Sequence, residues 1–253
     1  MESENIEVKD VTEKPVAEEE KNGDEKKTPV VIFCVPGNQF SNRFLTSWTA
    51  TMVALVQKNY RFLLVNQYSS VVHYARAKCL GGDISGGEDQ KPYQGEIDYD
   101  YIFWIDSDIV FTPEQVFAMI ESPHDVTSAL YMMDDAQHFA VVKKWDLEYF
   151  KKNKHFEFLK MEDIEKMQKE QRYNAVNYAG MGFMCIKKGV IEKLKYPWFW
   201  RGLERIEVDG EEGKTMVDMA SEDVNFCKNI QDAGLEIMLD TYVRVGHEKK
   251  MIL

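Results

Sequence analysis

The chain has 253 residues, of which 44% are hydrophobic and 12% aromatic, so it can bury a core and is not disordered as a whole. Its formal net charge of −12 argues against binding nucleic acid through a basic face. No apolar run approaches the ~18 residues of a membrane span, and the acidic start does not resemble a signal peptide. We therefore expect a soluble, cytoplasmic protein.

Residues 1–29 differ from the rest of the chain. They hold ten acidic and five basic residues and no aromatic residue. Such a segment cannot offset the entropy lost on ordering by burying apolar surface. We predict that it is a disordered acidic tail that precedes a single folded domain at 30–253.

The first half of this domain alternates strand and helix patterns. A continuous apolar run at 30–35 predicts a buried strand that stops at Pro36-Gly37-Asn38. The following patterns predict a helix from Ser41 or Asn42 to about Lys58, a strand at 61–66, a helix at 71–80, a loop at 81–95, a strand at 101–105 and a helix from Thr112. This order predicts an α/β fold with a mixed, mostly parallel sheet flanked by helices, in which ligands bind at the carboxyl ends of the strands.

The second half is less regular. We predict strands at 125–131, 139–144, 178–186 and 236–240 and helices at 146–172, 187–195 and 221–233, with a long loop at 203–220. The four cysteines lie among apolar residues, and no two have the spacing of metal ligands. Cys34, Cys79, Cys185 and Cys227 are therefore predicted to be reduced core thiols.

Two carboxylates stand at the end of the strand predicted at 101–105. Asp106 and Asp108 are two positions apart, so they are expected to point to the same side. Two carboxylates in one cleft repel each other unless a cation lies between them. Mg²⁺ and Mn²⁺ prefer oxygen ligands and often share them with the phosphates of a substrate.

Other segments each fit two interpretations. Glu222 and Asp223 open a predicted helix, where they either complement its dipole or supply a general base. His247 is either a surface residue or a third metal ligand, and Arg76 is either exposed or neutralises a diphosphate. The aromatic run at 198–200 either stacks on a sugar or fills the inside of a loop.

Together these segments resemble the GT-A glycosyltransferases. The resemblance covers roughly residues 30–250 and is carried, in order, by Asp106-Ser107-Asp108, AGMGFMCI at 179–186, SEDVNFC at 221–227 and VRVGHE at 243–248. It implies a metal-dependent enzyme that moves one sugar from a nucleotide-diphosphate sugar, with a UDP-sugar favoured, to a hydroxyl of a glycan or glycoconjugate. The compact, tail-bearing domain is also similar to glycosyltransferases encoded by large algal DNA viruses.

The resemblance also implies residue roles. It makes 30–110 the nucleotide-binding half and 111–253 the acceptor half. Asp223 would be the base of an inverting reaction, with Glu222 as the alternative. The implied ligands of Mn²⁺ or Mg²⁺ are Asp106, Asp108 and His247. The implied donor-binding residues are Pro36, Gly37, Asn38, Arg76, Asp106 and Ser107. The implied acceptor-binding residues are Gly180, Gly182, Trp198 and Trp200.

Three alternatives stay open. Residues 103–110 also resemble the nucleophile motif of haloacid-dehalogenase-type phosphatases, with Asp106 and Asp108 as the motif's acids and 134–135 as a late acid pair. That family places its nucleophile on the first strand of the domain, whereas two predicted strands precede Asp106 here. A nucleotidyltransferase would need a glycine-rich, lysine-bearing loop after the first strand, which the sequence lacks. The third alternative is a non-catalytic domain that binds a glycan.

Overall fold

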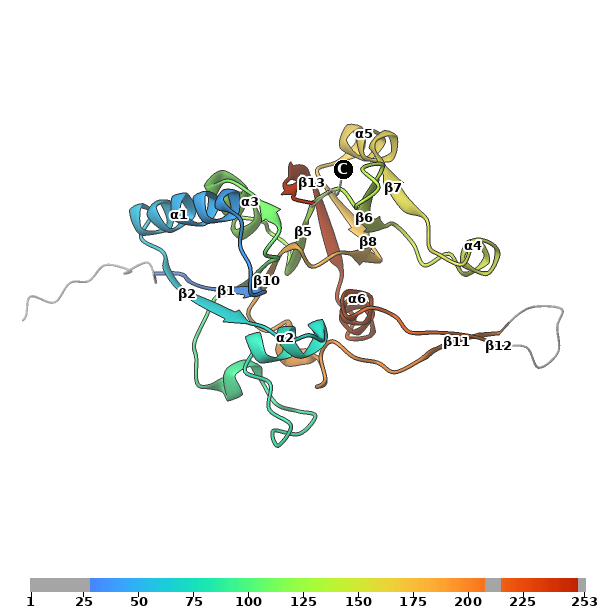
Figure 1. Cartoon of the computed structure of the whole chain (residues 1–253), viewed down its shortest axis with the longest axis horizontal. Coiled ribbons are helices and arrows are strands. Elements are labelled where there is room, and N and C mark those ends of the chain that lie inside the picture. Colours follow the sequence, from blue (N-terminus) through green and yellow to red (C-terminus); the bar gives the residue numbers. More distant parts are fainter. Residues whose placement is uncertain (1–27, 208–214, 250–253) are drawn as a thin grey trace, which may run out of the picture.

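The computed structural model describes residues 28–207 and 215–249. Its centre is a seven-stranded sheet in the order β2-β1-β3-β10-β5-β13-β8 (Figure 1). Five strands run in one direction, and β10 and β8 run in the other. The bounds are β1 Val30–Pro36, β2 Arg61–Gln67, β3 Tyr101–Ile105, β5 Val126–Leu130, β8 Tyr173–Val176, β10 Phe183–Lys187 and β13 Ile237–Arg244. The predicted mixed α/β fold with a mostly parallel sheet is confirmed.

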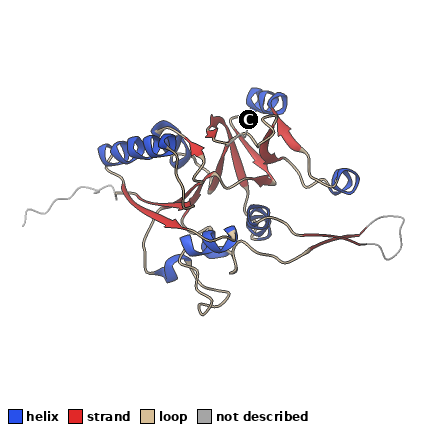
Figure 2. Cartoon of the chain, viewed as in Figure 1, coloured by secondary structure: helices blue, strands red, loops and turns tan. Residues whose placement is uncertain are grey.

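Helices cover both faces of this sheet (Figure 2). Helices α1 (Asn42–Gln57) and α3 (Pro113–Ile120) pack over one face, with α2 (Val72–Cys79) and α6 (Glu222–Asp232) over the other. Alternate residues of β1 divide between the two cores, because successive side chains of a strand point to opposite faces. Capping side chains mark the start of two of the helices. The Ser41 hydroxyl accepts a hydrogen bond from the Phe44 amide, and Thr112 forms a capping box with Gln115.

Smaller elements surround the sheet. The strand β4 (Ile109–Val110) pairs with β14 (Gly246–His247) near the chain's end. A three-stranded sheet in the order β7-β6-β9 contains Phe158–Lys160, His138–Val142 and Tyr178–Ala179. The remaining elements are η1 Pro92–Gly95, α4 Leu147–Asn153, α5 Met161–Glu170, η2 Ile191–Lys193, β11 Glu204–Glu207 and β12 Thr215–Asp218. Among the described residues, none of the helices combines the length and the apolar character that a membrane crossing needs.

The elements of the first half, the helix at 221–233 and the four buried, unbridged cysteines agree with prediction. Four predictions are wrong. The strand predicted at 178–186 is two strands, β9 and β10, which belong to different sheets. Residues 146–172 are not one helix, because Lys154 takes a left-handed conformation that ends α4 and the next residues form β7 before α5. Residues 187–195 form only a short 3-10 turn after Gly189, whose φ is +92°.

The fourth concerns the predicted loop at 203–220. Its described residues form a hairpin, in which β11 pairs antiparallel with β12. Side chains on β11 alternate between half-buried and exposed, a strand pattern that the glycines and acids of this stretch obscured. Residues 208–214, between the two strands, lie outside the described part of the chain, as does the predicted acidic tail apart from its last two residues.

Candidate active site

A cavity of about 330 Å³ opens at the carboxyl ends of β1 and β3. It is lined by Pro36, Gly37, Tyr68, Ser69, Val72, Ala75, Arg76, Asp106, Ser107, Asp108 and Glu222. An adjoining cavity contains Asn38 beside Ser107 and Asp108. The structure thus brings all six predicted donor-binding residues to one place. Tyr68, Ser69 and Val72 were not predicted, because nothing in their local sequence marks a ligand site.

Gly37 allows the turn after β1 to approach the turn after β3. A Cβ at this position would lie 2.8 Å from Ser107 Oγ, and its φ is +142°. A side chain would therefore be strained and would push the two turns apart. This explains why the turn after the apolar run at 30–35 contains a glycine.

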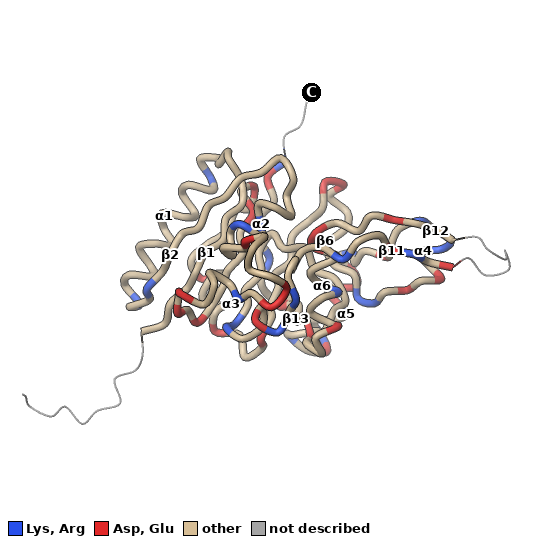
Figure 3. The backbone as a smooth tube through the Cα atoms, turned by 90° about the horizontal axis from the view of Figure 1, so that it is seen from below, with Lys and Arg blue, Asp and Glu red and all other residues tan. Residues whose placement is uncertain are grey.

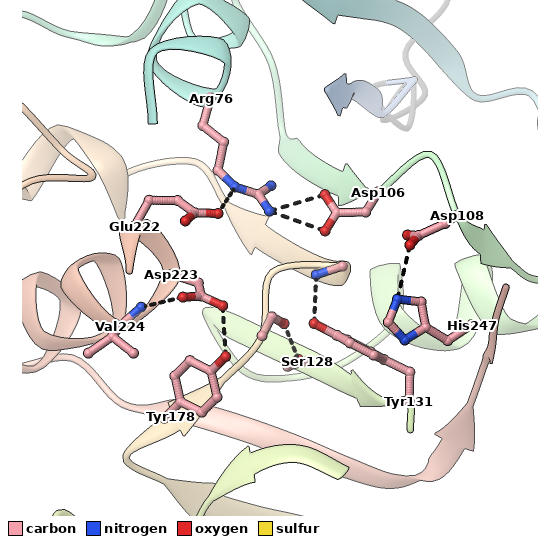
Figure 4. Close-up of polar contacts among 12 residues, drawn as sticks. Arg76, Asp106, Asp108, Ser128, Tyr131, Tyr178, Glu222, Asp223, Val224 and His247 are labelled. Carbon is pink, nitrogen blue, oxygen red and sulfur yellow. Dashed lines mark hydrogen bonds and ion pairs between the residues drawn. The ribbon is translucent and has the colours of Figure 1, made fainter. Parts of the chain in front are cut away.

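Arg76 is a buried cation between two acids (Figure 4). Its side chain is only 3% exposed, with Nε 3.1 Å from Glu222 Oε1 and Nη2 3.1 Å from Asp106 Oδ1. Burial alone would lower the pKa of Arg76, but the carboxylates of Asp106 and Glu222 raise it above its usual value. Nη1 is buried without a hydrogen-bond partner among the described residues. The interpretation of Arg76 as an exposed residue is therefore wrong.

Asp108 and His247 form a second centre beside this cavity (Figure 4). The β4–β14 pairing sets His247 opposite Ile109, so its Nε2 lies 3.1 Å from Asp108 Oδ2. Lys249 Nζ donates to the same oxygen at 3.0 Å. Burial raises the pKa of Asp108, but His247 and Lys249 outweigh it and lower the pKa to about 2. Burial lowers the pKa of His247, and its bonds to Asp108 and Met132 raise it overall.

The donor atoms of this centre suit a divalent cation. His247 Nδ1 lies 2.6 Å from the Met132 carbonyl oxygen, which fixes Nδ1 as the protonated nitrogen and leaves Nε2 as the ligand atom. Within the described residues no three His, Cys, Asp or Glu side chains are grouped to bind a metal. Asp106 does not join Asp108 and His247, because both of its oxygens face Arg76. Mg²⁺ and Mn²⁺ need few protein ligands when phosphates complete their shell, so Asp108 and His247 fit the role.

The two acids that open α6 point to different partners (Figure 4). Glu222 contacts Arg76, whereas Asp223 Oδ2 accepts a 2.7 Å hydrogen bond from the Tyr178 hydroxyl. Asp223 Oδ1 accepts hydrogen bonds from the Val224 amide and the Ser221 hydroxyl. Burial raises the pKa of Tyr178, and the Asp223 charge adds to this, so the phenol keeps its proton as a donor. Tyr178 was missed, because its role appears only when β9 packs against α6.

The two glycines predicted to bind an acceptor are covered by another side chain. Gly180 and Gly182 are buried beneath Tyr131, whose hydroxyl accepts a hydrogen bond from the Gly182 amide at 3.2 Å. The ring of Tyr131 also packs edge-on against His247, with 5.2 Å between the ring centroids. The structure therefore corrects the prediction: these glycines make room for Tyr131 and present no open surface to an acceptor.

This packing gives a testable result. A Cβ on Gly180 would overlap the Tyr131 hydroxyl, so Gly180→Ala is expected to destabilise the protein by ~1–3 kcal/mol, the usual cost of overpacking. Urea unfolding measures this change. Adding Tyr131→Phe should recover part of the loss, because it removes the overlapped oxygen. A Gly180→Ala variant as stable as the wild type would contradict the packing.

The two predicted acceptor tryptophans differ in exposure. Trp198 is 0% exposed within the core, so the prediction that it stacks on a sugar is wrong. Its ring packs edge-on against Tyr196, so Trp198 fills the inside of the loop. Trp200 is 41% exposed, and its ring lies 5.6 Å from that of His73 on α2. Only Trp200 keeps a surface that a ligand could reach.

Comparisons with known proteins give similar structures only. Neither a protein-family model nor a curated protein matches the chain. A197 from STIV is 16% identical with a TM-score of 0.48, and the match covers 89% of this chain and 97% of that one. The catalytic domain of Drosophila β1,4-galactosyltransferase 7, complexed with xylobiose, is 12% identical with a TM-score of 0.46, covering 88% and 72%. GalNAc-T7 with UDP, GalNAc and Mn²⁺ is 10% identical with a TM-score of 0.42, covering 88% and 43%.

Proposed function

We propose that the protein is a metal-dependent glycosyltransferase that moves one sugar from a nucleoside-diphosphate sugar, with a UDP-sugar favoured, to a hydroxyl of a glycan or glycoconjugate. The observation that carries this proposal is the Arg76 bridge. It joins the acid after β3 to the first acid of α6, so that two motifs 116 positions apart, Asp106 and Glu222, face one cavity. Such a cavity at the carboxyl ends of parallel strands is the expected ligand site of an open α/β sheet.

The donor side of the reaction needs positive charge. Departure of a nucleoside diphosphate builds negative charge on its phosphates, and Arg76 supplies a buried cation with the free Nη1 donor. Asp108 and His247 would hold Mn²⁺ or Mg²⁺, which when bound supplies further charge to stabilise the leaving group. Asp106 keeps Arg76 oriented and would contact the donor from the cavity wall.

The acceptor side needs a base. Asp223 would remove the proton of the attacking hydroxyl, with Tyr178 and the Val224 amide holding its carboxylate in place. Glu222 holds Arg76 in place through Oε1 and is the alternative base. A single displacement from the face opposite the leaving group would invert the anomeric configuration.

A donor-hydrolysis assay tests the proposal. The full chain is incubated with UDP-, GDP- or dTDP-sugars and Mn²⁺, and free nucleoside diphosphate is measured. We expect slow, Mn²⁺-dependent release from one nucleotide class, because a water molecule replaces the missing acceptor. Release of inorganic phosphate from small phosphoesters would instead indicate a phosphatase, and release of pyrophosphate from a nucleoside triphosphate and a sugar phosphate a nucleotidyltransferase. Saturable glycan binding without turnover would indicate a non-catalytic domain.

A further inference from the structure

The charge of the chain is unevenly distributed. Residues 28–82 hold five basic residues and no acidic one, in a chain of net charge −12. The remaining residues therefore carry −17. This basic segment forms β1, α1, β2 and α2. Of these, α1, β1 and β2 lie at one end of the molecule, and the backbone of α1 and β2 carries no acidic residue (Figure 3). Arg76 is buried between two carboxylates, so the exposed positive charge of this end comes from Arg43, Lys58 and Arg61. A basic end on an acidic protein favours an anionic partner.

Helix α1 exposes apolar side chains on its outer side. Its residues 44–57 include no charged residue. Leu45 is 61%, Val53 53% and Val56 67% exposed, and their spacing places them along one side of the helix. A surface helix normally presents charged side chains to water, whereas the exposed residues at 44–57 are apolar or uncharged, among them Thr46 and Thr49.

Strand β2, at the edge of the sheet, extends this surface. The ring of Phe62 packs edge-on against Trp48 of α1, with 6.3 Å between centroids, so Phe62 points to the α1 side of the sheet. Leu64, two residues further, points to the same side and is 50% exposed. We call Leu45, Val53, Val56 and Leu64 the α1 face.

Basic residues border the α1 face. Arg43 and Lys58 stand at the two ends of α1, and Arg61 begins β2, all three exposed. Arg43 is 3.7 Å from Glu248 and Lys58 is 3.9 Å from Glu121, and such long exposed ion pairs contribute little. Lys58 Nζ also lies 3.7 Å from the centroid of the Phe117 ring. These are weak surface contacts, so the three charges can still face an anionic surface.

We propose that the α1 face docks on the surface of a membrane that contains anionic lipids. The aliphatic side chains would enter the boundary between headgroups and acyl chains, and the three basic residues would contact lipid phosphates. A second copy of the chain fits less well, because two-fold packing of α1 on α1 would place Arg43 near Lys58 of the other copy. Docking of this kind needs no membrane-spanning helix, and it does not depend on the proposed function.

The docked membrane would lie close to the candidate active site. Phe40 and Ser41, which immediately precede α1, line a cavity together with Ser107 and Asp108. The start of the docking helix and the carboxylate proposed to hold the cation are thus parts of one cavity wall.

Vesicle co-sedimentation tests the proposal. The full chain is mixed with vesicles of phosphatidylcholine containing about 30% phosphatidylglycerol, or with vesicles of pure phosphatidylcholine. We expect binding to the anionic vesicles, weakened by high salt, and little binding to the neutral ones. Leu45→Glu/Val56→Glu should lower the bound fraction at least about fivefold, because it places two charges in the inserted surface. Hydrogen exchange on the wild type should slow in 42–64 when anionic vesicles are added.

The matched control is Ile84→Glu/Leu147→Glu, which adds the same charge at two exposed apolar positions away from α1. This control should bind anionic vesicles nearly as well as the wild type, and thermal unfolding should show both double variants folded. No binding to anionic vesicles, or an equal loss in both variants, would overturn the proposal. A dimer detected by light scattering that Leu45→Glu/Val56→Glu dissociates, without vesicle binding, would assign the α1 face to a second copy instead.

Discussion

Asp223→Asn is expected to lower turnover by ~10²–10⁴-fold, the usual range for loss of a general base. The amide nearly keeps the shape of the carboxylate but cannot accept the proton of the acceptor hydroxyl. Donor affinity should change little, because Asp223 contacts Tyr178 and Val224 rather than the cavity beside Arg76. Steady-state kinetics with donor and acceptor, together with calorimetric titration of the nucleoside diphosphate, would separate the two effects.

Glu222→Gln is the matched comparison. It should weaken the Arg76 bridge and lower donor affinity, with a smaller direct effect on turnover. The turnover of Tyr178→Phe should lie between that of the wild type and that of Asp223→Asn, because this variant removes one hydrogen bond to the base but keeps the base. If Glu222→Gln shows the larger loss of turnover and Asp223→Asn does not, the base is Glu222.

Asp108→Ala is expected to abolish metal-dependent binding of the nucleoside diphosphate. Removal of the carboxylate takes away one of the two ligands proposed among the described residues, so the loss should exceed the ~10–100-fold typical of an outer-shell partner. Titration of UDP with and without Mn²⁺ measures it, and EDTA should reduce the wild type to the level of the variant. Turnover should fall in parallel, because the leaving group loses its counter-charge.

Asp135→Asn is the control for this variant. Asp135 lies on an exposed turn, where its carboxylate pairs with His138 at 2.6 Å. The Asp135→Asn variant should keep Mn²⁺-dependent UDP binding if Asp108 and His247 hold the metal. A phosphatase that used 134–135 as its late acid pair would instead lose activity in Asp135→Asn. Unchanged metal-dependent binding in Asp108→Ala would contradict the metal assignment.

The sequence allowed those parts of the site to be predicted that depend on local signals. The acids at Asp106 and Asp108 follow an uninterrupted apolar strand, and Glu222 begins a periodic helix. Strand periodicity and helix-start signals act over a few residues, so they can be recognised without the fold. They place the carboxylates at the ends of elements, which is where the structure has them.

The other features of the site depend on packing between residues that are far apart in the sequence. Arg76 follows no local rule, and its burial depends on two carboxylates that arrive from other elements. The prediction that Trp198 binds an acceptor is wrong, because the sequence does not show that the core closes around it. Tyr131 covers Gly180 only because β5 and the turn before β10 come together across the sheet. Contacts of this kind are properties of the assembled chain.

The β4–β14 pairing bears on when the site forms during folding. Asp108 and His247 are in contact although they are 139 positions apart in the sequence, and Arg76 and Glu222 are 146 positions apart. Contacts between such distant residues carry a large loop-closure entropy and tend to form late. The pairing that holds His247 has only two residues on each strand, so it should open before the seven-stranded sheet does. Partial denaturation would then separate Asp108 from His247 while the core and its fluorescence remain native.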